Sequence, residues 1–253
     1  MAQNDFLQKS RSDDPKSLTF GYDYGLNGIS SFPLGDFAKT TQSTLPKKGL
    51  IGPDTNKLNG YAKKGFHYDV YVTYKIKKDL NFIFAIYGDQ NNYNADALNT
   101  QFLQYYPSAT SAVTTGSNYY IVQYVAGPYL DIPLPANFGI EIKAMAGYTT
   151  ANYPGLFYIT LPGTEIYTIQ KGSGFGYTFG TGMKYTLPDL DGPVGLGFHI
   201  NINYSASNIT YPGYNVTTYD AAGNYVAGYT YHVPKTMAVS ILQVTFGVSV
   251  ELF

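Results

Sequence analysis

The sequence predicts an all-β fold, an eight-stranded up-and-down antiparallel β-barrel that spans a membrane. Eight segments of about ten residues alternate apolar and polar side chains, the length that a tilted strand needs to cross a bilayer. Long and short connections between these segments follow one another in strict alternation. Only 13% of the 253 residues are charged, whereas Tyr and Gly occur 27 times each. So few charges are atypical of a water-exposed surface, and we expect the apolar face of the strands to point outward into lipid.

Each strand is predicted from its period of two, because alternate side chains of a strand point to opposite faces. The first apolar row pairs with a row of Thr, Gly, Asp and Asn, and the second is the clearest of all, facing His, Asp, Tyr, Thr and Lys. The later rows face mostly Gly, Thr, Ser, Asn and sparse charges of both signs. In chain order the expected apolar rows run over residues 18–26, 66–76, 82–86, 120–130, 138–146, 175–185, 194–204 and 244–252.

The connections fall into two classes. Three are short and rich in turn-forming residues: 77–79, 133–137 and 188–193. Four are long, and the third and fourth of these contain hairpins of their own, around residues 161–164 and 220–224. Membrane barrels have short turns on one side of the membrane and long loops on the other, with both chain ends on the side of the short turns. We therefore expect the last four strands to continue beyond the membrane as a protruding sheet.

A soluble eight-stranded barrel, with its apolar face inward, shows the same alternation. The composition of the polar face favours the membrane barrel, because a water-exposed surface would carry many Lys and Glu side chains. Aromatic residues also gather toward the strand ends on the apolar face, as in the girdles at the two lipid–water interfaces. These residues are Tyr24, Phe66, Tyr74, Phe138, Tyr148, Tyr185 and Tyr204.

The final strand carries a recognisable pattern. Thr245, Gly247, Val250 and Leu252 are a polar residue, a glycine and two spaced hydrophobic residues, and Phe253 ends the sequence. This pattern resembles the closing strand and assembly signal of Gram-negative outer-membrane barrels. With the eight-strand architecture, residues 17–253 resemble the small OmpA and OmpX type of barrel.

This resemblance implies a location in the outer membrane of a Gram-negative bacterium, after export directed by a signal peptide removed before Met1. It also implies contact with outer-membrane lipid and lipopolysaccharide, with the barrel assembly machinery during insertion, and with other outer-membrane proteins. Residues 1–16 are polar and mixed in charge, and we expect a flexible periplasmic tail. The chain has no cysteine, and its net charge of −1 gives no electrostatic reason to expect nucleic acid.

The inward rows predict a polar network that fills the lumen. Isolated charges are costly in a narrow lumen, so opposite charges should pair there. The alternative is a narrow conduction path through the same residues, for small or apolar solutes. The predicted network consists of Asp23, His67, Asp69, Lys75, Glu141, Lys143, Lys184, His199 and Glu251.

A lipid-modifying barrel needs a serine hydroxyl, a nearby histidine that takes its proton, and a carboxylate that orients the histidine. No His-x-Ser pair lies on a lipid-facing row, and the pair His67 and Asp69 has no evident nucleophile. We therefore expect no enzyme, no cofactor and no metal site.

The long loops contain exposed aromatic residues that could bind a partner, because Tyr offers contact area at low entropic cost. The alternative is that these residues only pack the loops on one another. We expect an anchor whose outer loops bind a protein or a glycan. The candidate binding residues are Tyr105, Tyr106, Tyr158, Tyr167, Tyr219 and Tyr225.

Overall fold

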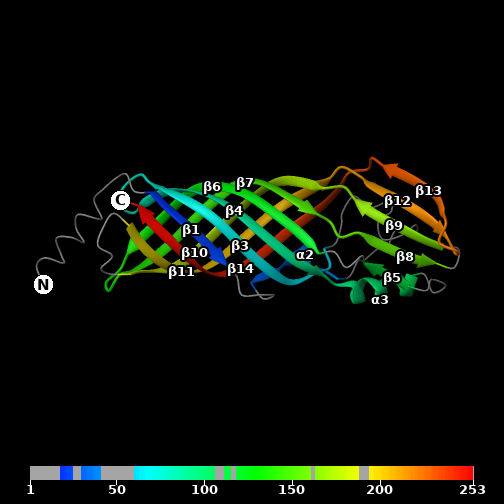
Figure 1. Cartoon of the computed structure of the whole chain (residues 1–253), viewed down its shortest axis with the longest axis horizontal. Coiled ribbons are helices and arrows are strands. Elements are labelled where there is room, and N and C mark those ends of the chain that lie inside the picture. The colour runs from blue at the N-terminus through cyan, green and yellow to red at the C-terminus, as the bar shows by residue number, and fades with distance from the viewer. Residues whose placement is uncertain are drawn as a thin grey trace, which may run out of the picture.

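Eight long strands form a ring in the computed structural model, which describes residues 18–24, 30–40, 60–105, 111–114, 118–160, 163–187 and 194–252 (Figure 1). Neighbouring strands are antiparallel, and β1 pairs with both β14 and β3, so that the ring joins its first strand to its last. The predicted barrel is therefore confirmed. Its strands are β1 (Leu18–Tyr24), β3 (Ala62–Lys75), β4 (Leu80–Tyr93), β6 (Tyr119–Pro133), β7 (Phe138–Asn152), β10 (Gly172–Thr186), β11 (Val194–Tyr211) and β14 (Lys235–Leu252).

The alternation of side chains is as predicted, with the apolar rows outside. On β14, Gln243, Thr245 and Ser249 are buried in the lumen, whereas Phe246 and Val248 are exposed on the outer surface. The same pattern holds around the ring, and it produces an outward belt of apolar side chains over a barrel whose interior holds many polar ones. An apolar exterior with this strand pattern is stable only against lipid.

A second sheet stands beyond the outer end of the barrel (Figure 1). It contains β8 (Leu156–Thr160) and β9 (Gly163–Ile169), then β12 (Tyr214–Asp220) and β13 (Tyr225–Tyr231). These are the two hairpins expected in the third and fourth long loops. β5 (Ser111–Thr114) completes the sheet, in the order β13-β12-β9-β8-β5.

The first two long loops contain elements that the sequence did not predict. β2 (Ser31–Pro33) pairs with β14 and β3, and α2 (Gly35–Ala38) follows it. The second loop contains α3 (Ala95–Tyr105) and β5. The strands β2 and β5 have only three and four residues, so a period of two is not evident in either of them. Among the described residues, no helix is both long enough and apolar enough to cross a bilayer.

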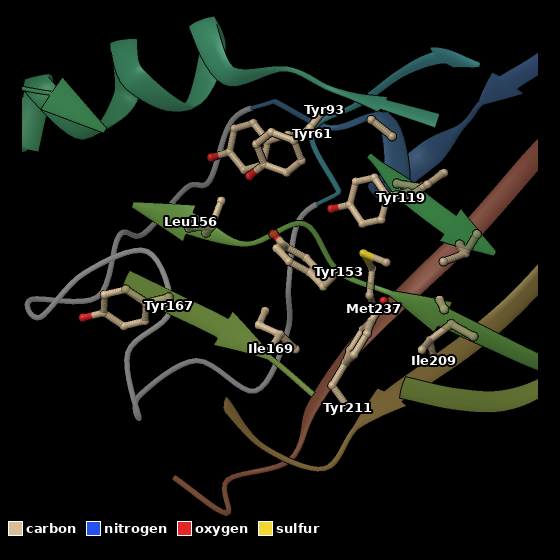
Figure 2. Packing of buried hydrophobic residues seen from close by; sticks show 14 of the residues in the cluster. Tyr61, Tyr93, Tyr119, Tyr153, Leu156, Tyr167, Ile169, Ile209, Tyr211 and Met237 are labelled. Atoms are coloured by element: carbon tan, nitrogen blue, oxygen red, sulfur yellow. The ribbon is translucent and has the colours of Figure 1, made fainter. Parts of the chain in front are cut away.

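A large apolar core fills the space between the outer end of the barrel and the second sheet. Figure 2 shows its tyrosines: Tyr93, Tyr119 and Tyr153 lie ring against ring, with Tyr211 against Tyr153. The outer parts of β11 and β14 contribute Ile209 and Met237 among others, because the inward-facing row of these strands is apolar at this level. The described residues of the outer mouth are thus joined by side-chain packing into one apolar cluster.

Candidate functional site

The lumen contains two clusters centred on histidines, and the first lies near its inner end. His199 on β11 lies between two partners: its Nδ1 is 2.8 Å from Oε1 of Glu141, and its Nε2 is 2.5 Å from Oγ of Ser249. The Tyr129 hydroxyl donates a hydrogen bond of 2.5 Å to the same Glu141 oxygen. Four strands, β6, β7, β11 and β14, are thereby connected across the interior.

The second cluster lies nearer the outer end, around His67 on β3. Its ring nitrogens are 3.0 Å from Asp69 Oδ2 and 2.9 Å from Asp89 Oδ1. Gln243 on β14 donates from Nε2 to the other Asp89 oxygen at 2.8 Å, and Ser205 on β11 donates to Gln243 at 3.2 Å. All these side chains are buried, so each carboxylate depends on such partners in place of water.

A third group of charges closes the inner mouth. Lys184 on β10 forms an ion pair with Glu251 and another, 3.1 Å long, with Asp131 on β6. Lys143 is buried farther inside, with its ammonium 5.9 Å from the centre of the Tyr71 ring. Charges of both signs therefore alternate along the lumen.

Most of the predicted network is brought together. His67 and Asp69 form one cluster, Glu141 and His199 another, and Lys184 and Glu251 a pair. Lys143 is buried close to Glu141 on β7. Lys75 is half-buried at the inner end of β3. The backbone of Asp23 pairs with Asp69 and Gly247, and its side chain lies outside the described part of the chain.

Sequence reasoning missed several polar partners, among them Asp89, Asp131, Gln243 as a bridging group, and Ser249 as the partner of His199. The third strand was extended only to residue 86, although the inward phase of β4 continues through Tyr87 to Asp89. Alternation gives the face of Ser249 but not its neighbour across the lumen. Cross-lumen contacts depend on the stagger of the barrel, which the period of two does not encode.

The prediction of a purely polar lumen was incomplete. A second apolar cluster lies inside the barrel, mostly on β4, β6 and β7. At these positions the strands have apolar residues on their inward faces as well as on their outward faces, so their sequences alternate less clearly than those of the other strands. The lumen therefore contains an apolar cluster on strands that also carry buried charges such as Asp89 and Glu141. The apolar cluster consists of Tyr71, Ile83, Ala85, Tyr87, Val125, Tyr129 and Met145.

The order Ser249, His199, Glu141 is that of a nucleophile, a base and an orienting acid. The surroundings of Ser249 are crowded: a β-carbon built on Gly197 would lie 2.6 Å from its hydroxyl oxygen. The serine is also buried, beneath the ion pairs of Lys184. In the described residues no group of three or more acidic or histidine side chains is arranged to hold a metal ion.

The candidate loop residues have different environments. Tyr225 is exposed and Tyr219 half-buried, with their rings in an edge-to-face contact. The prediction for Tyr167 was wrong: it is only 7% exposed, because its ring packs on Tyr214 in the apolar core. The remaining loop candidates lie outside the described structure: the side chains of Tyr105 and Tyr158, and the whole of Tyr106. Phe253 of the assembly signal and the predicted tail 1–16 also lie outside it.

The predicted assembly signal lies on β14 in the expected phase. Thr245 is buried in the lumen, and Val250 and Leu252 are exposed on the outer face at its inner end. Its role in assembly stays a prediction.

Comparisons with known proteins found no matching protein-family model and no matching curated protein. Among solved structures, Neisserial surface protein A is similar with 14% identity and a TM-score of 0.40, covering 93% of this chain and 96% of that one. A major outer membrane protein from Thermus thermophilus has 7% identity and a TM-score of 0.42, covering 94% and 100%. Outer membrane protein OprG from Pseudomonas aeruginosa has 8% identity and a TM-score of 0.39, covering 94% and 96%.

The physical evidence for the class of this protein comes from its own surface. The ring of eight antiparallel strands leaves no open edge in the hydrocarbon, as a chain in lipid requires. Its exterior is apolar, its interior carries the charges, and its long connections are all at one end. These are the properties of outer-membrane barrels. The chain is a small eight-stranded β-barrel with the physical features of a membrane-spanning barrel.

Proposed function

We propose that the barrel is a non-enzymatic anchor and that its outer sheet binds a partner protein by strand addition at the edge strand β13. The observation that carries this proposal is the position of β13. In the described structure β12 is its one neighbour in the sheet, so its other edge presents backbone N–H and C=O groups to the surroundings. An extended segment of another protein can pair with such an edge.

The side chains of β13 also favour this role. Tyr225, Val226 and Tyr229 are 64%, 59% and 58% exposed, and the strand contains no charged residue and no proline. Soluble edges are normally protected by lysine, proline or a covering element. The opposite edge of this sheet, β5, lies against α3. One edge is covered and the other is open and aromatic, which favours β13 as the binding edge.

The expected partner is a surface-exposed protein with an extended segment of small and aromatic residues, either another outer-membrane protein or one on a facing cell. Tyrosines on both faces of β13 would contact alternate side chains of such a segment. Association within a larger outer-membrane complex is one form of the same function. Lipid, lipopolysaccharide and, during insertion, the barrel assembly machinery are expected partners of the barrel itself.

The lumen supports the anchor over its two rivals. Hydrogen-bonded side chains cross it at two levels, and the apolar core packs at its outer end, so a conducting path would require both to rearrange. Single-channel recording in planar bilayers should therefore show no steady conductance. A lipid-modifying enzyme would deacylate lipid in detergent and lose that activity on Ser249→Ala; we expect no activity in either form.

Site-specific crosslinking tests the binding edge in the native outer membrane. A photoreactive benzoylphenylalanine is placed at Val226 or Tyr229, and crosslinked species are identified by mass spectrometry. We expect the same defined protein adduct from both positions. Placing lysine at Ala227, beside a probe at Tyr229, should abolish the adduct, because a charge on the edge opposes strand pairing.

The matched control has the probe at Ala222, in the exposed turn of the same hairpin. If Ala222 yields the same adduct with equal efficiency, or if β13 yields none, the edge is not the binding site.

The turn that positions β13 should weaken in acid. Asp220 Oδ1 accepts hydrogen bonds from the backbone N–H groups of Ala222 (2.9 Å) and Asn224 (2.8 Å), and Oδ2 accepts one from Asn224 Nδ2 (3.0 Å). These bonds, above all those from Asn224, lower the pKa of the Asp220 carboxyl below its ordinary value. A lowered folded-state pKa means that the stabilisation is complete above about pH 4 and is lost as the pH falls through the folded value.

Proteolysis within the β12–β13 hairpin, followed as the pH is lowered with an acid-active protease, should therefore accelerate below about pH 4. Asp220→Asn should show fast cleavage that no longer varies with the ionisation of this residue. Equal pH profiles for the two proteins would contradict the expectation.

A further inference from the structure

The edge strand β13 has the composition that we expect of its own partner. Its register against β12 shifts at Val226, which has no partner residue there, and the ladder is regular from Ala227 to Tyr231. This regular segment consists of Ala, Gly, Tyr, Thr and Tyr, without charge and without proline. A second copy of the chain therefore carries an extended segment of small and aromatic residues, with one edge open in the described structure.

The regular segment is complementary to itself when two copies pair antiparallel about its middle residue, Tyr229. Each Tyr229 then lies opposite its counterpart, and aromatic cross-strand pairs of this kind stabilise a sheet. Gly228 lies opposite Thr230, and Ala227 lies opposite Tyr231, so small residues face larger ones. No like charges meet, and the Tyr229 side chain is 58% exposed, so its ring is accessible to a second copy.

The outer sheet is a direct continuation of the barrel wall. Beyond the last paired residues of β10 and β11, the Gln170 N–H donates a hydrogen bond of 3.0 Å to the Gly213 carbonyl, and β9 then pairs with β12. The ladder between β11 and β14 is followed in the same way by the ladder between β12 and β13. The plane of the outer sheet therefore contains the direction of the barrel axis, and the sheet stands upright on the membrane (Figure 1).

Antiparallel pairing of two β13 edges determines how the two barrels are oriented. Neighbouring antiparallel strands of one continuous sheet are related by a two-fold axis perpendicular to that sheet. Because this sheet stands upright, the two-fold axis lies in the plane of the membrane and reverses the direction of the barrel axis. The two barrels then point toward each other from two facing membranes.

The parallel alternative does not fit a single flat membrane. It would relate the two β13 edges by a two-fold axis along the strand. Strands of membrane barrels tilt by about 40°, and Figure 1 shows β12 and β13 inclined to the long axis of the molecule. Rotation about an axis with this tilt would turn one barrel by about 80° relative to the other, twice the tilt. Two barrels in one flat bilayer are upright together, which excludes this arrangement.

We propose that β13 pairs with β13 of a second copy in a facing membrane, so that the chain mediates homophilic adhesion between two cells. This inference rests on the proposed function, because it names the partner of the same edge. Pairing joins two five-stranded sheets into one continuous sheet. One short pairing is weak, but many copies on two facing surfaces act together and raise the overall avidity without new contacts.

A cysteine at the two-fold axis tests the pairing directly, because the chain has no cysteine of its own. Two populations of liposomes carry purified Tyr229→Cys with tags of different length, so that a disulfide between the populations gives a dimer of mixed size. Directly opposite Cα atoms of an antiparallel pair lie about 4.5–5.5 Å apart, within the range of a disulfide. We expect this mixed dimer when the populations are combined under mild oxidation.

Ala227→Cys is the matched control for the register. Two copies of residue 227 would lie about 13 Å apart along the paired strands, beyond the roughly 7 Å that a disulfide can bridge. We expect at least about tenfold less mixed dimer from Ala227→Cys than from Tyr229→Cys.

Charges at the same position test adhesion itself. Liposomes of the unaltered chain should cluster, as measured by dynamic light scattering, whereas Tyr229→Lys and Tyr229→Glu liposomes should each stay dispersed, because like charges would lie directly opposite each other. Mixing the two variants should restore clustering. Gln104→Lys adds a charge to the exposed side of α3, at the covered edge of the sheet, and should cluster like the unaltered chain. Heat-modified gel mobility shows that each variant is folded.

Each outcome bears on the proposal. Dispersed liposomes of the unaltered chain, or clustering that the Tyr229 charges do not change, would overturn homophilic pairing. Disulfide dimers confined to one population would overturn the facing arrangement. In the native outer membrane, the photoprobes on β13 should capture a second copy of the chain. If they capture a different protein, the proposed function stands and this inference falls; if they capture nothing, both fall.

Discussion

Replacing His67 by leucine is expected to destabilise the folded barrel by about 3–5 kcal/mol, because it breaks a buried ion cluster from one side only. The imidazole lies between Asp69 and Asp89, and all three side chains are fully or almost fully buried. Leucine restores volume but supplies no proton, so two carboxylates would face each other in a medium of low dielectric constant. Reversible urea unfolding in micelles, followed by gel mobility and tyrosine fluorescence, measures the loss.

Neutralising the carboxylates distinguishes the contribution of the buried charges to the loss of stability from the contribution of packing. The triple variant His67→Leu, Asp69→Asn, Asp89→Asn should recover a large part of the lost stability, since no buried charge is then left without a counter-charge. His232→Leu is the matched control, because this third histidine is exposed beyond the barrel, and its effect should stay within about 0.5 kcal/mol. A change below about 1 kcal/mol for His67→Leu would show that the cluster does not hold the wall together.

The second large effect is expected at Tyr119, the residue at the centre of the outer core in Figure 2. Its ring centre is 5.0 Å from that of Phe37 and 5.3 Å from that of Tyr153, and its hydroxyl donates a hydrogen bond of 2.5 Å to the Gly60 carbonyl. Truncation of a buried aromatic ring to alanine costs about 3–5 kcal/mol. Tyr119→Ala should therefore loosen the outer sheet.

Limited chymotrypsin digestion measures where the damage occurs. In Tyr119→Ala we expect fast cleavage in the outer hairpins and continued resistance of the strands within the micelle. Tyr119→Phe retains the ring and loses the hydrogen bonds of the hydroxyl with Gly60 and Tyr153, so its effect should be about 1–2 kcal/mol. Tyr120→Ala alters the next residue, whose side chain is exposed on the outer face, and should be nearly neutral. Uniform digestion of barrel and hairpins would contradict a separate outer core.

The face of each strand residue could be predicted from the sequence, since the period of two is a local property. His67, Asp69, Glu141 and His199 were placed in the lumen on this basis, and all are buried there. The pairing of His199 with Ser249 could not be predicted, because it depends on which strands face each other across the ring. Nothing local to either residue contains that information.

The outer ends of the strands were less predictable for a different reason. Beyond the belt the inward-facing row of the wall becomes apolar and packs beneath the second sheet, so an apolar side chain there no longer indicates the lipid-facing side. Tyr167 was predicted to be an exposed loop aromatic, yet it is 7% exposed and contributes, as does Phe102, to the outer core. The presence of a tyrosine in a long loop does not indicate whether its side chain binds a partner or packs beneath a sheet.

The pairing of β1 with β14 has a consequence for how the molecule is made. Leu18 pairs with Leu252, so one seam of the wall joins residues from opposite ends of the described chain. Hairpins such as β3–β4 can form from nearby residues, but this seam has the highest possible contact order, and the entropy lost in closing so long a loop is recovered only when it forms. Until then β1 and β14 would expose unpaired edges to hydrocarbon, where each free polar group is costly. We therefore expect closure of this seam to be the slow, late step of folding, the step at which a catalyst of insertion has most to accelerate.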